Sequence, residues 1–255
     1  MKNRKRFKLK SNKLINIFPM SDVHCGSPQF NQEYFEYMLD KINRTSGYKV
    51  IYLLGDLMDC ATKRLGNSAY KQIWSVEEQL EYITEQLKPF KNCIRGCVLG
   101  NHESRFKKEF DLDIMKVLCD NLDINYDGIE IYDSFCINNV PYTIWGTHGT
   151  KTSQQQHLMM GNVERQTNHI EANLYLYGHA HYCANWSKVM KNGENYKRKH
   201  YCLTGHFLNY DGYAQEKLLK PNLPSFNKIT INKNFRTNIE QYNLDEQREG
   251  IYNLE

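Results

Sequence analysis

Residues 49–59 have the sequence KVIYLLGDLMD, an apolar run that ends in a glycine and two aspartates. The run Lys49–Leu54 is short and continuous, as expected of a strand that is buried on both faces of a sheet. In α/β sheets the functional groups collect in the loops beyond the carboxyl ends of the strands. The stretch therefore predicts a central strand that presents Asp56 and Asp59 at its carboxyl end.

The same arrangement, a predicted strand followed directly by polar residues, occurs at four other places in the chain. The four motifs are Asp22-Val23-His24, Gly100-Asn101-His102-Glu103, Gly146-Thr147-His148-Gly149 and Gly178-His179-Ala180-His181. We expect the five corners to meet at one rim of the sheet. Carboxylate oxygen, amide oxygen and imidazole nitrogen together suit divalent metals such as Mn, Fe, Ni or Zn, and the motifs lack the thiolates of a structural zinc site.

Each motif on its own has an ordinary structural explanation. Asp56 and Asp59 are typical of a helix cap or a turn, and His148 beside glycines is typical of a turn. Gly100-Asn101-His102-Glu103 is the most specific of the five motifs. Their joint order, each one after a strand, is very hard to obtain by accident and favours a shared site.

The rest of the chain alternates between predicted helices and predicted strands. Helices are expected over Tyr34–Asn43, Val76–Leu87, Asp111–Asn121 and Gln154–Ala172. Strands are expected over Leu14–Met20, Cys93–Leu99, Ile129–Ile137, Val140–Trp145, Leu174–Tyr177, Val189-Met190, His200–Leu203 and Phe226–Ile231. Asn138-Asn139 and Asn192-Gly193 predict hairpin turns. The pattern predicts one α/β sandwich domain over residues 1–255, with a basic arm over 1–13 and an irregular polar tail over 232–255.

The composition is that of a globular protein. The 255 residues are 40% hydrophobic and 13% aromatic, which is enough for one core and too much for a chain that stays unfolded. No run approaches the roughly 18 apolar residues of a membrane-spanning helix, so an integral membrane protein is excluded. Eight cysteines without paired CxxC motifs predict reduced thiols, and the basic N-terminus lacks the apolar core of a signal peptide; both favour a cytoplasmic protein.

The five motifs together resemble the signature of the calcineurin-like metallophosphoesterase superfamily, which is DxH, GDxxD, GNH(D/E), an isolated His and GHxH in that order. The resemblance extends from Asp22 to His181 and implies a four-layer α/β/β/α sandwich, with two central mixed β-sheets flanked by helices. It also implies a centre of two divalent metal ions, with Mn expected and Fe, Zn or Ni as alternatives. Carried over position by position, one metal is held by Asp22, His24 and His181, the second by Asn101, His148 and His179, and both by Asp56.

The resemblance implies hydrolysis of phosphate esters. The two metals lower the pKa of a bridging water, and the resulting hydroxide attacks phosphorus. His102 is expected to point at the substrate and to protonate the leaving oxygen as a general acid. Glu103 is expected to orient the His102 imidazole and keep it charged. Asp59 is expected to support a ligand histidine, and a turn-capping role for it is equally compatible with the sequence.

Two further residues are candidates for substrate binding. Arg105 lies two residues beyond Glu103, where a guanidinium can hold a phosphate oxygen, although a solvated arginine fits the polar loop equally well. His206 follows the predicted strand His200–Leu203 and is expected either at the rim of the site or, by the simpler interpretation, on the surface.

The substrate class is narrowed by residues around the motifs. Serine/threonine phosphatases of the superfamily carry an arginine directly after GDxxD, where this chain has Cys60. Only 74 residues follow His181, too few for the large cap of the repair exonucleases. The chain is most similar to small single-domain bacterial and phage phosphoesterases, so a phosphodiesterase or nuclease acting on nucleotides or nucleic acid is the first hypothesis.

Two alternatives stay open. The same fold could serve a phosphomonoesterase or phosphoprotein phosphatase. In a different class of protein, the basic arm Lys2–Lys13 would bind nucleic acid and the sandwich would be a non-catalytic platform. The completeness of the five motifs argues against the platform. The expected partner is thus a phosphate ester rather than a membrane, and no pattern in the sequence indicates an oligomeric state.

Overall fold

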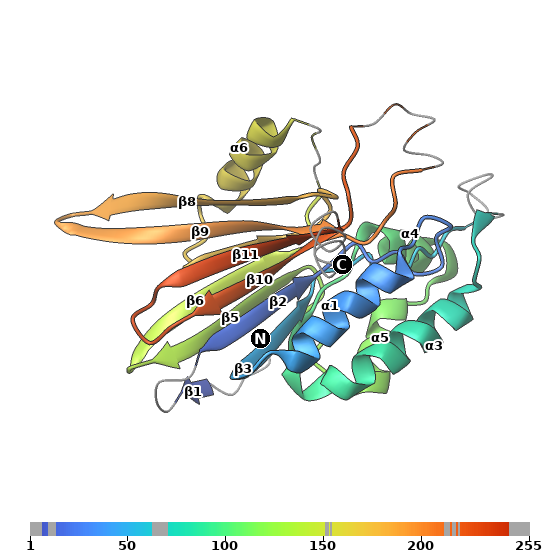
Figure 1. The fold of residues 1–255 in the computed structure, drawn as a ribbon, viewed down its shortest axis with the longest axis horizontal. Coiled ribbons are helices and arrows are strands. Elements are labelled where there is room, and N and C mark those ends of the chain that lie inside the picture. The colour runs from blue at the N-terminus through green and yellow to red at the C-terminus, as the bar shows by residue number, and fades with distance from the viewer. Residues whose placement is uncertain are drawn as a thin grey trace, which may run out of the picture.

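The protein forms a four-layer sandwich in which two β-sheets lie between helices, as the sequence predicted. The structure, a computed structural model, describes residues 7–9, 14–62, 71–150, 153, 155–211, 215, 218 and 220–244. Figure 1 shows α1, α3, α4 and α5 together on one side of the strands and α6 on the other. Most of the predicted basic arm and the end of the predicted tail lie outside the described residues.

One sheet carries three of the motifs, those that contain Asp22, Asp56 and Asn101. Its strands are β2 (Ile15–Met20), β3 (Tyr48–Leu53), β4 (Ile94–Cys97), β10 (Ser225–Ile231) and β11 (Thr237–Asn243). β2, β3 and β4 pair in parallel, β10 pairs antiparallel to β2, and β11 pairs antiparallel to β10. Its outer face is covered by the helical elements α1 (Gln32–Arg44), α3 (Val76–Leu87), η2 (Lys88–Cys93), α4 (Asn101–Phe110) and α5 (Ile114–Leu122).

The other sheet carries the last two motifs. Its strands are β1 (Phe7–Leu9), β5 (Glu130–Ile137), β6 (Val140–Thr147), β7 (Leu174–Tyr177), β8 (Cys183–Asn192) and β9 (Asn195–His206). β6, β7 and β9 are parallel, and α6 (Gln156–Thr167) covers the outer face. The two sheets join at one end, where His206 and Gly205 of β9 pair with Ser225 and Phe226 of β10.

Side-chain alternation explains the layers. Ile15 and Ile17 of β2 point into the core between the sheets, whereas Phe18 and Met20 point into the core under the helices. A third cluster packs α6 against Trp145, Tyr175 and Tyr201 of the other sheet. In β3, neighbouring residues likewise enter both cores, which confirms that the run Lys49–Leu54 includes a strand buried on both faces.

The strands expected at Val189-Met190 and His200–Leu203 extend over β8 and β9, and three further α-helices or strands were not predicted. The predicted irregular tail contains β11, an edge strand that is held by backbone pairing with β10 and therefore shows little apolar alternation. Residues 7–9 of the predicted arm form β1, paired with β5. The sequence analysis also missed α4, which begins at Asn101 and is mostly polar because one face is open to solvent.

The predicted helix Val76–Leu87 is found with the same boundaries, and a capping box between Ser75 and Glu78 begins it. The Asn138-Asn139 turn has positive φ at both residues, as a tight hairpin turn requires. All eight cysteines are free. Among the helices that the structure describes, none has the length and apolarity needed to cross a bilayer.

Candidate metal centre

Five residues of the motifs have a backbone conformation that side chains other than glycine rarely adopt. Asp22, His24, Asp56, His179 and His181 all have φ between 50° and 64°. They lie directly beyond the carboxyl ends of β2, β3 and β7. The loops are tied together, since the Asp22 N–H donates to Gly55 O (3.1 Å) and the His24 N–H to Asp56 O (3.0 Å). Strained residues held by their surroundings in this way cluster at functional sites.

A first group of ligand atoms comes from Asp22, His24 and His181. His181 Nε2 lies 3.2 Å from Asp22 Oδ1 and 3.4 Å from His24 Nε2, and His24 Nε2 lies 3.9 Å from Asp22 Oδ1. Ligands about 2.1 Å from one metal ion lie about 3.0–3.4 Å from each other, so the first two distances are those of a coordination shell. Asp22 and His24 are buried, and His181 is 38% exposed at the mouth of the site.

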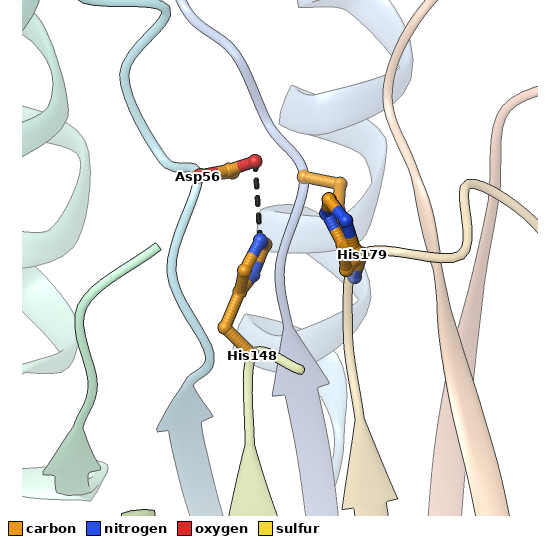
Figure 2. Close-up of side chains that lie close together, drawn as sticks. Asp56, His148 and His179 are labelled. Atoms are coloured by element: carbon orange, nitrogen blue, oxygen red, sulfur yellow. Dashed lines mark hydrogen bonds and ion pairs between the residues drawn. The ribbon is translucent and has the colours of Figure 1, made fainter. Parts of the chain in front are cut away.

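A second group comes from Asp56, Asn101, His148 and His179, which the two sheets bring together. Figure 2 shows Asp56 and His148 directed toward each other from different strands, with His179 beside them. Asp56 Oδ2 lies 3.2 Å from His148 Nε2, and Asn101 Oδ1 lies 2.9 Å from the same nitrogen. The Asn101 oxygen also faces Asp56 Oδ2 at 3.0 Å and His179 Nδ1 at 2.8 Å.

Asp56 lies between the two groups. Besides its contact with His148, its Oδ2 is 3.8 Å from His24 Nε2 of the first group. Both Asp56 and Asp22 are almost completely buried. Burial alone would raise the pKa of each carboxyl, but the neighbouring imidazoles outweigh it and hold both pKa values below the ordinary range. Both aspartates are therefore buried anions that need a positive partner.

The residues present fit divalent metal ions. Asp22 Oδ1 is buried and accepts no hydrogen bond from the described residues. The Asn101 oxygen faces only acceptors in its present orientation, an arrangement that a cation between them would satisfy. The donor set, carboxylate and amide oxygens with imidazole nitrogens, is one that intermediate divalent metals accept. Burial lowers the pKa of His179 to about 4, which leaves a neutral imidazole available as a ligand.

The His148 ring is oriented by a contact that the sequence did not predict. Its Nδ1 lies 2.8 Å from Leu54 O, the carbonyl at the end of the strand that carries Asp56. A donor at Nδ1 leaves Nε2 to face Asp56 and Asn101. Burial would lower the pKa of His148, but Asp56 outweighs it and raises this pKa to about 9. Sequence alone could not have found this contact, because Leu54 acts through its backbone.

Two glycines allow the second and third motifs to approach each other. A Cβ on Gly100 would lie 2.1 Å from Asp56 N, and a Cβ on Gly55 would lie 2.4 Å from Gly100 N. Because glycine has no Cβ at these two positions, the His102 N–H can donate to Asp56 Oδ1 at 2.8 Å. This bond fixes the start of α4 against the loop after β3 and brings Asn101 and His102 to the site.

His102 lies beside the ligand groups with its ring partly exposed. Its Nδ1 lies 2.7 Å from Asp59 O and 3.4 Å from Asp59 Oδ1, and its Nε2 lies 4.0 Å from Asp56 Oδ2. Burial would lower the pKa of His102, but Asp59 and Asp56 outweigh it and raise this pKa above its ordinary value. Asp59 Oδ1 is also 3.7 Å from His24 Nδ1, so Asp59 lies beside a candidate ligand histidine.

The expected contact between Glu103 and His102 is wrong. The buried Glu103 carboxylate accepts hydrogen bonds from the backbone N–H groups of Asp56 (3.0 Å), Leu57 (2.8 Å) and Met58 (3.1 Å). On a helix, adjacent residues point in different directions, so Glu103 faces the loop after β3 whereas His102 faces the site. Burial and the nearby Asp56 raise the pKa of Glu103 to about 7. Asp59, not Glu103, contacts the His102 ring.

The two candidate substrate residues lie near the ligand groups. Arg105 is half-buried, and its Nε donates to Asn101 O at 3.2 Å. His206 is 3% exposed, with its ring stacked on His181 at a centroid distance of 5.6 Å. The simpler interpretation of His206 as a surface histidine is therefore wrong, because the pairing of β9 with β10 buries it. Burial lowers the pKa of His206 to about 3.

The chain matches the model of a known protein family. The model of the calcineurin-like phosphoesterase family matches residues 15–206, from the start of β2 to the end of β9. The chain belongs to the calcineurin-like phosphoesterase family. A search of curated proteins found no match. The family is metal-dependent and acts on phosphate esters, and the clustered aspartates and histidines of this phosphoesterase are groups that can hold metal.

Several solved structures resemble the phosphoesterase at low sequence identity. A metallophosphoesterase of Sphaerobacter thermophilus has 15% identity and a TM-score of 0.46, over 89% of this chain and 88% of that chain. The calcineurin-like phosphoesterase YfkN of Bacillus subtilis has 10% identity and a TM-score of 0.42, over 92% of each chain. Vps29 of Entamoeba histolytica, in complex with zinc, has 12% identity and a TM-score of 0.38, over 89% of this chain and 98% of that chain.

Proposed function

We propose that this phosphoesterase uses two divalent metal ions to hydrolyse phosphodiesters of nucleotides or nucleic acid. The observation that carries the proposal is the pair of ligand groups on either side of Asp56, whose Oδ2 is 3.2 Å from His148 Nε2 and 3.8 Å from His24 Nε2. A single structural ion needs about four ligands, whereas this site gathers seven. Such a surplus is expected of a two-metal centre.

The residues that would hold the metals divide as the motifs suggest. Asp22, His24 and His181 would hold the first ion, Asn101, His148 and His179 the second, and Asp56 both. Manganese suits this mixture of oxygen and nitrogen ligands, and iron, zinc or nickel are the alternatives. When bound, the ions would neutralise charge on the phosphoryl oxygens and lower the pKa of a water molecule.

His102 would act as the general acid. Nδ1 is held against Asp59 O, so Nε2 is the ring atom that can deliver a proton toward the ligand groups. The carboxylates of Asp59 and Asp56 raise the pKa of His102, so the ring carries the proton that it would donate. The proton would pass from Nε2 to the leaving oxygen as the ester bond breaks.

A diester is favoured over a monoester by the charges near the site. A phosphomonoester dianion carries more charge than a diester and needs additional cations to hold it. Cys60, which follows Asp59, is buried and neutral and cannot provide one. Arg105 would provide a single guanidinium for a phosphate oxygen.

The eight free thiols support the expectation of a reducing, cytoplasmic compartment.

The test is a panel of substrates with Mn²⁺ added to metal-free protein. It contains p-nitrophenyl phosphate, its bis-diester, cyclic nucleotides, and single- and double-stranded DNA and RNA. We expect the ratio of diester to monoester kcat/KM to exceed one. A ratio below one would support the phosphomonoesterase alternative, and no turnover of any ester would support the non-catalytic platform.

A further inference from the structure

A cavity of about 500 Å³ lies at the opposite end of the strands from the metal centre. It is lined by Tyr196, Arg198 and His200 of β9 and, across the space between the sheets, by Phe235, Arg236 and Thr237. His206 lies six positions beyond His200 along β9, a distance of about 20 Å at about 3.3 Å per residue. The cavity is therefore separate from the candidate metal centre, and its volume is that of a ligand pocket.

The cavity exists because the apolar core between the sheets stops before the strands do. On β9, Cys202 faces this core, and the alternate residues His200, Arg198 and Tyr196 continue the same face beyond it. Figure 1 shows the β8–β9 hairpin reaching past the ends of the neighbouring strands. Tyr196 is 70% exposed there, so its ring is accessible to a ligand in the cavity.

The opposite wall is held in place by its own hydrogen bonds. Asn232 Oδ1 accepts from the backbone N–H groups of Asn234 (2.9 Å) and Arg236 (3.1 Å). Phe235 has φ of 60° and stacks on Tyr142 at a centroid distance of 6.2 Å. The turn between β10 and β11 therefore presents the Arg236 side chain from a fixed backbone rather than from a loose loop.

The charges around the cavity favour an anion. The hairpin Cys183–His206 contains five lysines and arginines and a single acidic residue, Glu194. Lys197 pairs with Glu171 at 2.5 Å. Arg198 and Arg236 are exposed, and neither has a carboxylate partner among the residues that the structure describes. Arg198 donates only to the neutral Ser187 Oγ at 3.3 Å among the printed contacts of the described residues, so two guanidinium groups without a carboxylate partner line the same cavity as the exposed Tyr196 ring.

We propose that this cavity binds single-stranded nucleic acid, with Arg198 and Arg236 on phosphate oxygens and Tyr196 stacked on a base. Guanidinium groups hold phosphates, and aromatic rings stack on unpaired bases of any sequence. The site would hold a polynucleotide on the protein away from the scissile bond. Its use in catalysis rests on the proposed function, but binding itself requires neither metal nor turnover.

Binding is measured in EDTA by fluorescence anisotropy, with labelled oligothymidylate and oligouridylate of about 16 nucleotides as probes. The variant Arg198→Ala/Arg236→Ala should weaken binding at least fivefold, and the slope of log K against log salt should fall by about 1.4 for two lost phosphate contacts. Tyr196→Ala should weaken binding about 5- to 100-fold. The matched control is Lys188→Ala/Arg44→Ala, which removes two exposed cations away from the cavity.

The outcomes distinguish this site from general electrostatic attraction. Equal losses in the arginine pair and the control pair would overturn the proposal, as would unchanged binding in both. Duplex DNA bound as tightly as the single strand would contradict the stacking role of Tyr196. Binding by the arginine-dependent site without any esterase activity would support this inference while contradicting the proposed function. Comparison of the two probes then shows whether the site prefers DNA or RNA.

Discussion

The position of His102 is set by three contacts with two aspartates. Its backbone N–H donates to Asp56 Oδ1, its Nδ1 lies against Asp59 O, and Asp59 Oδ1 is 3.4 Å from the same nitrogen. These contacts hold the ring at Nδ1, and Nε2 is directed toward the ligand groups. His102 also forms, with His24 and Asp56, a group that could hold a metal, so the proposed general-acid role needs a test that measures metal content as well as turnover.

His102→Ala should retain metal and lose most turnover of esters with poor leaving groups. General acid catalysis contributes about 10²- to 10⁴-fold, so kcat for an alkyl phosphodiester should fall by that factor. Hydrolysis of a nitrophenyl ester, whose leaving group needs no proton, should fall much less. Metal content measured by elemental analysis is the control, and an equal loss on both esters would remove His102 from the general-acid role.

Glu103→Gln should lower stability rather than change proton transfer. The Glu103 carboxylate accepts three backbone hydrogen bonds from residues 56–58, and the amide would turn an N–H group toward one of those donors. The pKa of Glu103 is raised to about 7, so the carboxylate is charged above that pH. Because a hydrogen bond to a charged group contributes about 1.5–3 kcal/mol, we expect the free energy of unfolding to fall by about that amount in urea titrations above pH 7. The pH at which kcat changes should stay the same. A shifted pH profile with unchanged stability would contradict this role.

At the scale of elements, a buried ion pair links the two sheets. Asp133 of β5 accepts from Arg95 of β4 at 2.7 and 2.8 Å, and Tyr52 of β3 donates to the same carboxylate at 2.8 Å. The side chain of Asp133 is 2% exposed. Burial alone would raise the pKa of Asp133, but Arg95 outweighs it and the pKa lies below its ordinary value.

Asp133→Asn should destabilise the protein by about 1.5–3 kcal/mol, because the hydrogen bonds from the partly exposed Arg95 guanidinium lose their charged acceptor. The pKa of Asp133 is lowered in the folded state, so its contribution is complete above the ordinary carboxyl pKa of about 3.9 and is lost as pH falls through the folded value. Unfolding in urea at several pH values should therefore give a difference between wild type and variant that narrows only in acid. A difference that is constant down to the lowest pH would contradict the ion pair.

The elements also explain how the motifs meet. β2 and β3 are parallel neighbours, so the first two motifs emerge side by side, and α4 begins directly after β4 with Asn101 and His102 in its first turn. In the other sheet β6 and β7 are also parallel neighbours, so the motifs of His148 and His179 emerge side by side. The two sheets join through β9 and β10. The carboxyl ends of β2 and β3 in one sheet and of β6 and β7 in the other therefore lie on either side of the site.

At the scale of the whole molecule, the candidate metal centre connects the two sheets. Asp22, His24 and Asp56 belong to one sheet, and His148, His179 and His181 to the other. Metal bound only to the folded state stabilises it, by about 2.7 kcal/mol for each site when the free metal is 100 times its Kd. Bound metal should therefore stabilise the packing of the two sheets against each other and raise the free energy of unfolding.

We expect Mn²⁺ to raise the Tm of metal-free wild-type protein and EDTA to reverse the change. Asp56→Asn should remove most of this increase, because the carboxylate faces both ligand groups. Differential scanning calorimetry with and without Mn²⁺ gives both values. A variant that still binds one metal with unchanged affinity would contradict the bridging position of Asp56, and an unchanged wild-type Tm would contradict the centre itself.

The sequence by itself determined most of the strands, most of the helices and the residue types of the site. Apolar periodicity reports which segments are buried, and each motif could be recognised because it directly follows such a segment, as Asp56 follows the run Lys49–Leu54. The four-layer arrangement came from the resemblance of the motifs in order. These features depend on neighbours in the chain or on the presence of particular side chains, and both are visible in a sequence.

Only the tertiary structure decided which partner each side chain has. Glu103 accepts hydrogen bonds from N–H groups more than forty residues away, and His206 is buried by a strand that pairs with it later in the chain. Arg198 and Arg236 line one cavity from different sheets. Periodicity tells that a side chain lies on a given face, but it does not tell which strand will lie opposite or which backbone N–H will lack a partner. Those depend on pairing between distant segments, which no local pattern specifies.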